Sequence, residues 1–236
     1  MFSRTKKIYI VSEVHPQHGG DMRTLETMII QCKMAGADAI KVQYYNSNKL
    51  FGDNRKLFAQ LNKDEMYHLE NYCNNIGIDF FASVFDVETL SFVIERNYPY
   101  IKISSRSIDN TELCGLALES NIKVLMSNGF DNKKFPYNHK NLYYLYCVSD
   151  YPCLLEKLDI PNFDQSKYFG YSCHAPGLTP AKTAVIKGAR IIEKHFTLSN
   201  NLQSGHEKGH FGSMDFDMLK DLRTFCDEFI QMDSQC

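Results

Sequence analysis

The chain has 236 residues, of which 44% are hydrophobic and 23% are charged, and its formal net charge is −2 at pH 7. A chain of this length and apolar content can bury a large core, in one large α/β domain or in two small ones. Its nearly balanced charge offers no general attraction to polyanions. This argues against nucleic acids and membrane surfaces as partners.

The sequence carries no signal for a membrane or an export route. It contains no run of about 18 apolar residues, the length that a membrane-spanning helix needs. The N-terminal apolar stretch ends at Glu13 and is too short for the core of a signal peptide. Eight cysteines are scattered without a CxxC pair, unlike those of a zinc cluster or a disulfide-rich secreted domain. We expect a soluble, cytoplasmic protein whose thiols are mostly buried and reduced.

Eight short runs rich in β-branched and aromatic residues predict strands. In chain order they span residues 7–13, 39–45, 78–85, 100–105, 122–127, 142–149, 168–174 and 189–196. Helical patterns follow the first, second, third, fourth, seventh and eighth of these runs. Alternating strands and helices indicate a parallel sheet.

The first helical pattern lies between the first two strands. Leu25, Met28, Ile29 and Cys32 recur at the spacing of one helix face, and Gly36 is placed to end the helix. A second apolar stripe near the C-terminus consists of Met218, Leu222, Phe225, Cys226 and Phe229. Ser213 is the predicted N-cap of that helix.

Eight βα units in a chain of this length predict a (β/α)8 TIM barrel, with residues 1–236 as a single domain. Two links, residues 131–141 and 151–163, are too short for full helices, so we expect shortened helices after strands 5 and 6. An open doubly wound sheet is the main alternative. No Gly-rich phosphate loop follows the first strand to favour it.

Polar side chains stand at the C-terminal end of every predicted strand, and in a barrel these ends share one rim. They are Glu13; Lys41 and Gln43; Ser83; Lys102 and Ser105; Ser127; Ser149 and Asp150; Ser172 and His174; and Glu193 and His195. Lysines and hydroxyls suit an anion such as phosphate, and two imidazoles suit a divalent metal. We therefore predict a site for an anion together with a metal, with Glu193 paired to a lysine and Cys173 turned away.

Several segments of the sequence resemble motifs of one known family. They are SEVHPQHGG, GADAIKVQ, ASVFD, IKISS, LMSNG, GYSCH and GARIIEKHFTL, and they occur in the family's order along nearly the whole chain. The family is that of the N-acetylneuraminate (sialic acid) synthases, which condense phosphoenolpyruvate with a sugar aldehyde on a (β/α)8 barrel.

The resemblance implies a role for individual residues of this chain. His174 and His195 match metal ligands, for which Mn²⁺ or Mg²⁺ is expected, and Glu13 matches a catalytic carboxylate that would handle the proton of the attacking water. Gln43 and Tyr151 match positions beside the sugar. The residues implied to bind phosphoenolpyruvate are Lys41, Ser83, Lys102, Ser105, Ser127 and Ser172.

The chain departs from the family on the acceptor side. Arg106 and Ser107 replace a Gly-Glu pair. The arginine either binds an acidic or phosphorylated acceptor or lies in a solvent-exposed loop without a role in binding. A family aspartate becomes Gly209, while His210 is kept, and His206 or Glu207 are candidate substitutes. His18 matches a family histidine better than His15 does.

The family usually continues into a small antifreeze-like domain that helps to hold the sugar, whereas this sequence ends at Cys236. We therefore expect an acceptor other than N-acetylmannosamine, or a separate protein that covers the acceptor site. An oligomer is possible, but the family's dimer does not carry over.

Two other functions stay open at this stage. A metal-dependent aldolase or sugar-phosphate isomerase would use the same barrel, with Lys41 or Lys102 as a Schiff-base candidate. A non-catalytic paralogue would bind phosphoenolpyruvate and act with a partner. The expected substrates are phosphoenolpyruvate and a sugar aldehyde.

Overall fold

The computed structural model describes residues 7–130, 134–151, 153–200 and 210–233. Eight parallel strands close into a barrel in the order β1 to β8, which confirms the predicted fold. The strands lie within the predicted runs, apart from one extra residue in β5. Their bounds are β1 Tyr9–Glu13, β2 Ala39–Tyr44, β3 Asp79–Val84, β4 Tyr100–Ile103, β5 Lys123–Asn128, β6 Leu142–Cys147, β7 Tyr168–Cys173 and β8 Ile191–His195.

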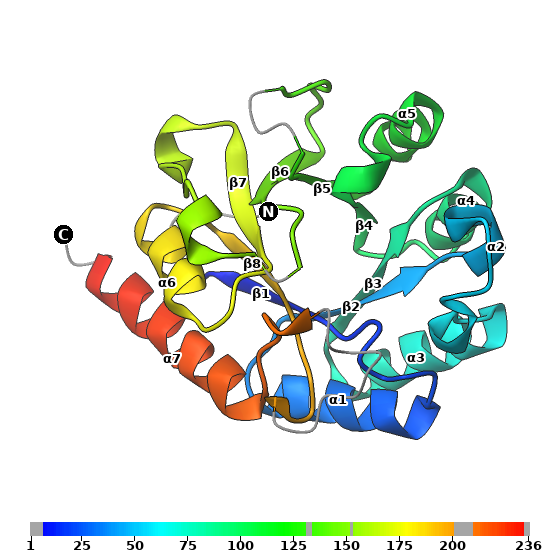
Figure 1. Ribbon diagram of the computed structural model, residues 1–236, viewed down its shortest axis with the longest axis horizontal. Coiled ribbons are helices and arrows are strands. Elements are labelled where there is room, and N and C mark those ends of the chain that lie inside the picture. The colour runs from blue at the N-terminus through cyan, green and yellow to red at the C-terminus, as the bar shows by residue number, and fades with distance from the viewer. Residues whose placement is uncertain (1–6, 131–133, 152, 201–209, 234–236) are drawn as a thin grey trace.

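Helices surround most of the barrel (Figure 1). They are α1 Met22–Met34, α2 Ser47–Phe51, α3 Lys63–Ile76, α4 Val87–Glu95, α5 Thr111–Glu119, α6 Thr179–Ile186 and α7 Phe216–Asp233. Short 3-10 turns are η1 Leu57–Ala59, η2 Ser105–Ser107, η3 Leu155–Lys157 and η4 Phe163–Gln165. The described residues between β5 and β7 carry only η3 and η4 outside β6, so the helices expected after strands 5 and 6 are reduced to loops and turns.

Helix α1 forms as its sequence pattern predicts. The Asp21 side chain caps its N-terminus by accepting a hydrogen bond from the Arg23 backbone N–H at 2.8 Å. The predicted apolar face is buried, and the chain leaves the helix through Gly36 at a φ of +94°. A positive φ is the conformation that glycine adopts at little cost after a helix.

Helix α7 begins later than predicted. Asp215, not Ser213, is its N-cap, because the Asp215 carboxylate accepts a hydrogen bond from the Met218 backbone N–H at 3.1 Å. The Ser213 hydroxyl instead donates to the His210 carbonyl at 2.7 Å and accepts from Gln17 Nε2 at 3.0 Å. Ser213 therefore ties the segment that carries His210 to the segment after β1.

The barrel interior has an aromatic floor below the polar rim. Tyr9, Phe81 and Tyr100 share strand faces with rim residues, since alternate residues of a strand point to the same side. Their rings pack edge to face, with centroids 5.5 Å apart for Tyr9 and Tyr100 and 5.3 Å apart for Phe81 and Tyr100. This floor closes the barrel below the rim.

Two further expectations concern the described residues alone. No helix among them is long and apolar enough to cross a membrane. The seven cysteines that they include are all buried and outside disulfide bonds, as predicted. Cys236 lies outside the described residues.

Gly170 is predicted to be essential for the packing of β7 on β8. It follows a shift in the register between β6 and β7, and a Cβ atom there would stand 2.4 Å from the Ile191 carbonyl oxygen. Because that atom belongs to the backbone, Gly170→Ala should lower the free energy of unfolding by about 1–3 kcal/mol. The measurement is urea denaturation.

Gly115→Ala is the matched control. A Cβ atom at Gly115, inside α5, would meet nothing within 4 Å. This substitution should raise stability by about 0.5–1 kcal/mol, as alanine usually does inside a helix. Equal effects of the two substitutions would contradict the role given to Gly170.

Candidate active site

A cavity of about 430 Å³ lies at the C-terminal end of the barrel. This volume is within the range of about 300–1,000 Å³ that is typical of small-molecule sites. Apart from His18 and Asp150, the predicted site residues that the structure describes line it. They are Glu13, Lys41, Gln43, Ser83, Lys102, Ser105, Arg106, Ser127, Ser149, Tyr151, Ser172, His174, Glu193, His195 and His210.

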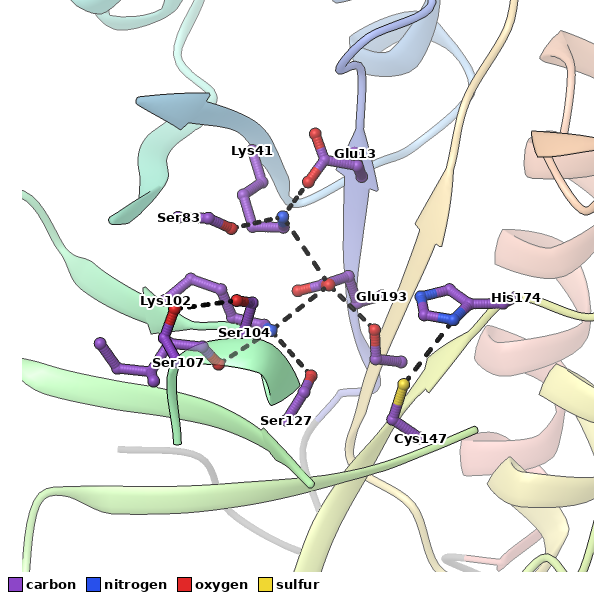
Figure 2. Close-up of polar contacts among 12 residues, drawn as sticks. Glu13, Lys41, Ser83, Lys102, Ser104, Ser107, Ser127, Cys147, His174 and Glu193 are labelled. Carbon is purple, nitrogen blue, oxygen red and sulfur yellow. Dashed lines mark hydrogen bonds and ion pairs between the residues drawn. The ribbon is translucent and has the colours of Figure 1, made fainter. Parts of the chain in front are cut away.

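Glu193 stands at the centre of the buried end of the cavity (Figure 2). Its Oε1 atom lies 3.8 Å from Lys41 Nζ and 3.7 Å from Lys102 Nζ, and it accepts a hydrogen bond from Ser172 Oγ at 3.0 Å. Burial by itself raises the pKa of Glu193, but the two lysines outweigh it, so that the pKa is lowered. The predicted pairing of Glu193 with a lysine is confirmed, and the partners are two lysines.

Lys41 also forms an ion pair with Glu13 and donates to Ser83 Oγ at 2.8 Å. Burial, together with repulsion by Lys102, lowers the pKa of Lys41 to about 8 against the attraction of Glu193. Lys102 donates to Ser127 Oγ at 2.7 Å. The two lysines are therefore surrounded by carboxylates and hydroxyls at the bottom of the site.

Three histidines and a tyrosine form the opposite wall. The ring centroids of His174 and His195 lie 5.9 Å apart, and those of His195 and His210 lie 4.2 Å apart. The Nδ1–H of His174 donates to the Val148 carbonyl at 2.9 Å, so its Nε2 atom presents a lone pair 2.9 Å from the Tyr151 hydroxyl. The sequence had indicated each residue by itself but not this cluster.

Burial keeps these three imidazoles neutral. It lowers the pKa of His174 to about 3 and that of His210 to about 4, and it holds the pKa of His195 well below its usual value. Neutral imidazole is the form that ligates divalent metals. The Nδ1 atom of His195 is also buried without a hydrogen-bond partner among the described residues, which suits a ligand atom.

The donor chemistry of His174 and His195 thus fits a divalent ion. Among the described residues, no group of three His, Cys, Asp or Glu side chains is arranged to hold a metal. A metal held by two histidines has coordination positions open for substrate or water. Cys173 is not such a ligand, because it is fully buried beside Lys194 Nζ at 3.5 Å and lies outside the cavity lining.

His15 and His18 are placed differently from the sequence-based expectation. His15 lines the cavity, whereas His18 lies behind it, with Nε2 3.1 Å from His15 Nδ1. Gly20 N–H donates to His18 Nδ1, so His18 donates to His15, and His15 donates to the Tyr45 hydroxyl at 3.1 Å. His18 therefore fixes the tautomer and orientation of His15.

Sequence reasoning missed several lining residues outside the strand ends. Phe51, at the end of α2, and Lys56 come from the link between β2 and α3, and Phe130 comes from the segment after β5. The short helix and the loops that carry them show no periodic pattern that would indicate a cavity wall. His206, Glu207 and Gly209 lie outside the described residues.

Comparisons with known proteins point to one family. A sequence model of the NeuB family matches residues 28–235. The chain is 29% identical to the N-acetylneuraminate-9-phosphate synthase of Drosophila melanogaster, covering 94% of this chain and 68% of that protein. It is 28% identical to a pseudaminic acid synthase of Campylobacter jejuni, covering 93% of this chain and 73% of that protein.

Solved structures agree with this family and fold. The crystal structure of an N-acetylneuraminic acid synthetase from Leptospira borgpetersenii superposes with a TM-score of 0.86 at 29% identity, covering 97% of this chain and 85% of that chain. A 3-deoxy-D-arabino-heptulosonate 7-phosphate synthase from Thermotoga maritima shares the fold alone, with a TM-score of 0.69 at 16% identity over 95% of this chain and 87% of that chain. The resemblance read from the motifs is confirmed, and the chain belongs to the NeuB family.

Proposed function

We propose that the protein condenses phosphoenolpyruvate with a sugar aldehyde to give a 2-keto-3-deoxy sugar acid and phosphate. The observation that carries the proposal is the pairing, in one cavity, of a buried lysine–serine end with a wall of neutral histidines. The related proteins named as synthases of N-acetylneuraminate 9-phosphate and of pseudaminic acid support it.

The buried end suits phosphoenolpyruvate, whose phosphate and carboxylate are both anionic. Lys41 and Lys102 supply positive charge there. Ser83, Ser105, Ser127 and Ser172 add hydroxyls that rotate to donate hydrogen bonds. The aromatic floor lies below this end, so the ligand would enter from the rim.

The reaction needs an activated aldehyde and a water molecule. A divalent ion, Mn²⁺ or Mg²⁺, held by His174 and His195 would supply Lewis acidity for the aldehyde oxygen. The C3 carbon of phosphoenolpyruvate would bond to the aldehyde carbon, and C2 would take up water. Release of phosphate then leaves the 2-keto group, so one phosphoenolpyruvate, one aldehyde and one water give one keto acid and one phosphate.

Glu13 is the proposed acceptor of the water proton. Its carboxylate is held in place by the ion pair with Lys41 and by the His15 backbone N–H, which donates to Oε1 at 2.9 Å. These donors fix the direction of the carboxylate, and a carboxylate is one of the groups that act as a general base.

The acceptor sugar would lie nearer the mouth of the cavity. Gln43, Tyr151, Arg106 and His210 line the cavity and are proposed to contact it, and His18 would act through His15. Because Arg106 and Ser107 replace a glycine and a glutamate of the family, an acceptor other than N-acetylmannosamine stays part of the proposal. A separate protein that covers this mouth also stays part of the proposal.

A second candidate is an aldolase that forms a Schiff base with a keto acid. It is favoured by Lys41 alone, because the pKa of this lysine is lowered to about 8 and a neutral amine is the nucleophile in such enzymes. Borohydride reduction in the presence of pyruvate would attach the keto acid covalently to Lys41 in an aldolase. In a synthase no such adduct is expected.

Loss of Lys102 should weaken phosphoenolpyruvate binding. Lys102→Ala removes a buried charge and is expected to raise the Kd about 10- to 100-fold, the usual effect of a charge-assisted hydrogen bond. Calorimetric titration of phosphoenolpyruvate measures it, with and without Mn²⁺. Lys182→Ala, which removes a half-buried lysine that is paired with Asp221 at 2.8 Å and lies outside the cavity lining, is the control and should bind as the unaltered protein does. Unchanged binding in Lys102→Ala would refute the assigned donor site.

Activity should fall at alkaline pH because of Lys41. Its pKa of about 8 means that this lysine loses its proton, and with it its attraction for the anion, as the pH rises through that value. The kcat/KM for phosphoenolpyruvate should therefore decline about tenfold per pH unit above it. Lys41→Arg, which stays charged, should lose this decline even if its activity is lower. A wild-type profile that stays flat well above that pH would contradict the prediction.

Metal binding should depend on both histidines. We expect Mn²⁺ to bind the protein in a calorimetric titration, chelation to stop turnover, and added Mn²⁺ to restore it. His195→Ala and His174→Ala should weaken Mn²⁺ binding by more than the roughly 10- to 100-fold that loss of an outer-shell partner causes. His68→Ala is the control, since His68 is exposed and pairs with Glu26. Mn²⁺ binding that survives His195→Ala would rule out this metal site.

A further inference from the structure

Two cations at the mouth of the cavity differ from the lysines at its bottom. Arg106, on η2, and Lys56, in the link between β2 and α3, both line the cavity. Lys41 and Lys102 are paired with Glu13 and Glu193. Arg106 and Lys56 form no ion pair with any Asp or Glu among the described residues.

The other cations of the β2–α3 link show the contrast. Lys49 is paired with Glu88 at 2.7 Å, and Arg55, the neighbour of Lys56 in the chain, is paired with Asp53 at 2.9 Å. Neither Lys49 nor Arg55 lines the cavity. Within this link, the cation that faces the cavity is thus the one without an acidic partner in the described part of the chain.

Aromatic contacts hold the two cations on the same side of the cavity. The Arg106 guanidinium lies 5.2 Å from the centroid of the Phe51 ring. The Phe51 ring packs edge to face on Tyr45 at 5.7 Å, and the Tyr45 hydroxyl donates to the Lys56 carbonyl at 3.1 Å. A connected set of contacts therefore runs from Arg106 to the backbone of Lys56.

The backbone at Lys56 is fixed from a second side as well. Its N–H donates to the Ser47 hydroxyl at 3.3 Å. The Tyr45 hydroxyl also accepts from His15, so the position of Lys56 is linked to the cavity wall. Lys56 is thus anchored beside the cavity and is not carried by a free loop.

The charges of both cations act on groups inside the cavity. After burial, which is the main cause, the charge of Lys56 contributes to the lowered pKa of His210 and of His15. The charge of Arg106 opposes the effect of burial on the pKa of the Tyr151 hydroxyl. An anionic ligand in the outer part of the cavity would therefore be attracted by the positive charges of both Lys56 and Arg106.

We propose that Arg106 and Lys56 form a subsite for an anionic group on the acceptor sugar, at the end remote from the aldehyde. A guanidinium offers two parallel N–H donors that match a phosphate or a carboxylate, and an ammonium adds a point charge. The shared chemistry is that of a terminal oxyanion on a sugar, either a phosphate monoester or a uronic carboxylate. This inference rests on the proposed synthase function, since it names the class of acceptor.

The test compares one hexose in three forms: mannose, mannose 6-phosphate and mannuronate. Each is titrated by calorimetry into the protein saturated with phosphoenolpyruvate, with a chelator present so that no turnover occurs. At least one anionic form should bind about 10- to 100-fold more tightly than mannose, as expected for hydrogen bonds to a charged group. The form that binds more tightly identifies the source of the oxyanion.

Charge-removing variants assign the effect to the two residues. Arg106→Gln and Lys56→Gln should each weaken binding of that anionic form about 10-fold or more, and the double variant should bind it no more tightly than mannose. Arg55→Gln is the matched control, because Arg55 is adjacent in the chain but outside the cavity lining, and it should change nothing. Affinity for phosphoenolpyruvate should stay within about twofold in Arg106→Gln, since the proposed donor site is at the other end.

Two results would overturn the proposal. One is equal binding of mannose and both anionic forms by the unaltered protein. The other is a loss of phosphoenolpyruvate affinity in Arg106→Gln as large as the loss for the sugar anion, which would place Arg106 in the donor site. If phosphoenolpyruvate fails to bind while the sugar anion still binds through Arg106, the synthase function fails and the anion subsite stands.

Discussion

Four buried charges at one end of the barrel constrain the rest of the site. Glu13, Lys41, Lys102 and Glu193 are almost completely inaccessible to solvent, and a single unpaired charge in such a place costs several kcal/mol. Their pairing requires that the barrel be closed, because Glu193 comes from β8 and reaches lysines on β2 and β4 across the interior. Closure in turn depends on β8 pairing with β1, where Glu13 stands beside His195. The charge pairs and the strand order therefore support each other.

The same burial explains why the histidine wall is neutral. Beside Lys102 and Lys41, a positive charge on His174 or His195 would be both desolvated and repelled, and both effects lower the pKa of these histidines. The protein thus separates two kinds of group within one cavity. The two lysines lie at the bottom, and neutral imidazoles, which offer lone pairs, lie along one side.

Strand alternation explains how much of this site could be predicted from the sequence. Once eight parallel strands are recognised, residues of one parity at their C-terminal ends must meet at the rim, and Glu13, Lys41, Lys102, His174 and His195 do so. The roles of these residues remain predictions. Their convergence, in contrast, can be predicted from the two-residue alternation of side chains along a strand and from the closure of the sheet into a barrel.

Loop residues could not be placed by the same reasoning. Ser213 and Asp215 are both suitable N-caps two residues apart, and tertiary contacts of Ser213 with His210 and Gln17 decide between them. The placement of His15 at the cavity and of His18 behind it depends on a hydrogen bond from the Gly20 N–H to His18 and on one from His15 to the Tyr45 hydroxyl, which no local pattern encodes.

The serines of the buried end hold the two lysines in place. Lys41 donates to Ser83 Oγ and Lys102 donates to Ser127 Oγ, so the position of each ammonium group is set by the protein itself. A hydroxyl can accept from a lysine in one state and turn to donate to a phosphate or carboxylate oxygen in the next. An anion would then replace the serine oxygens around each lysine without moving the lysines themselves. Because the ammonium groups need not reorganise, more of the interaction energy remains available for binding.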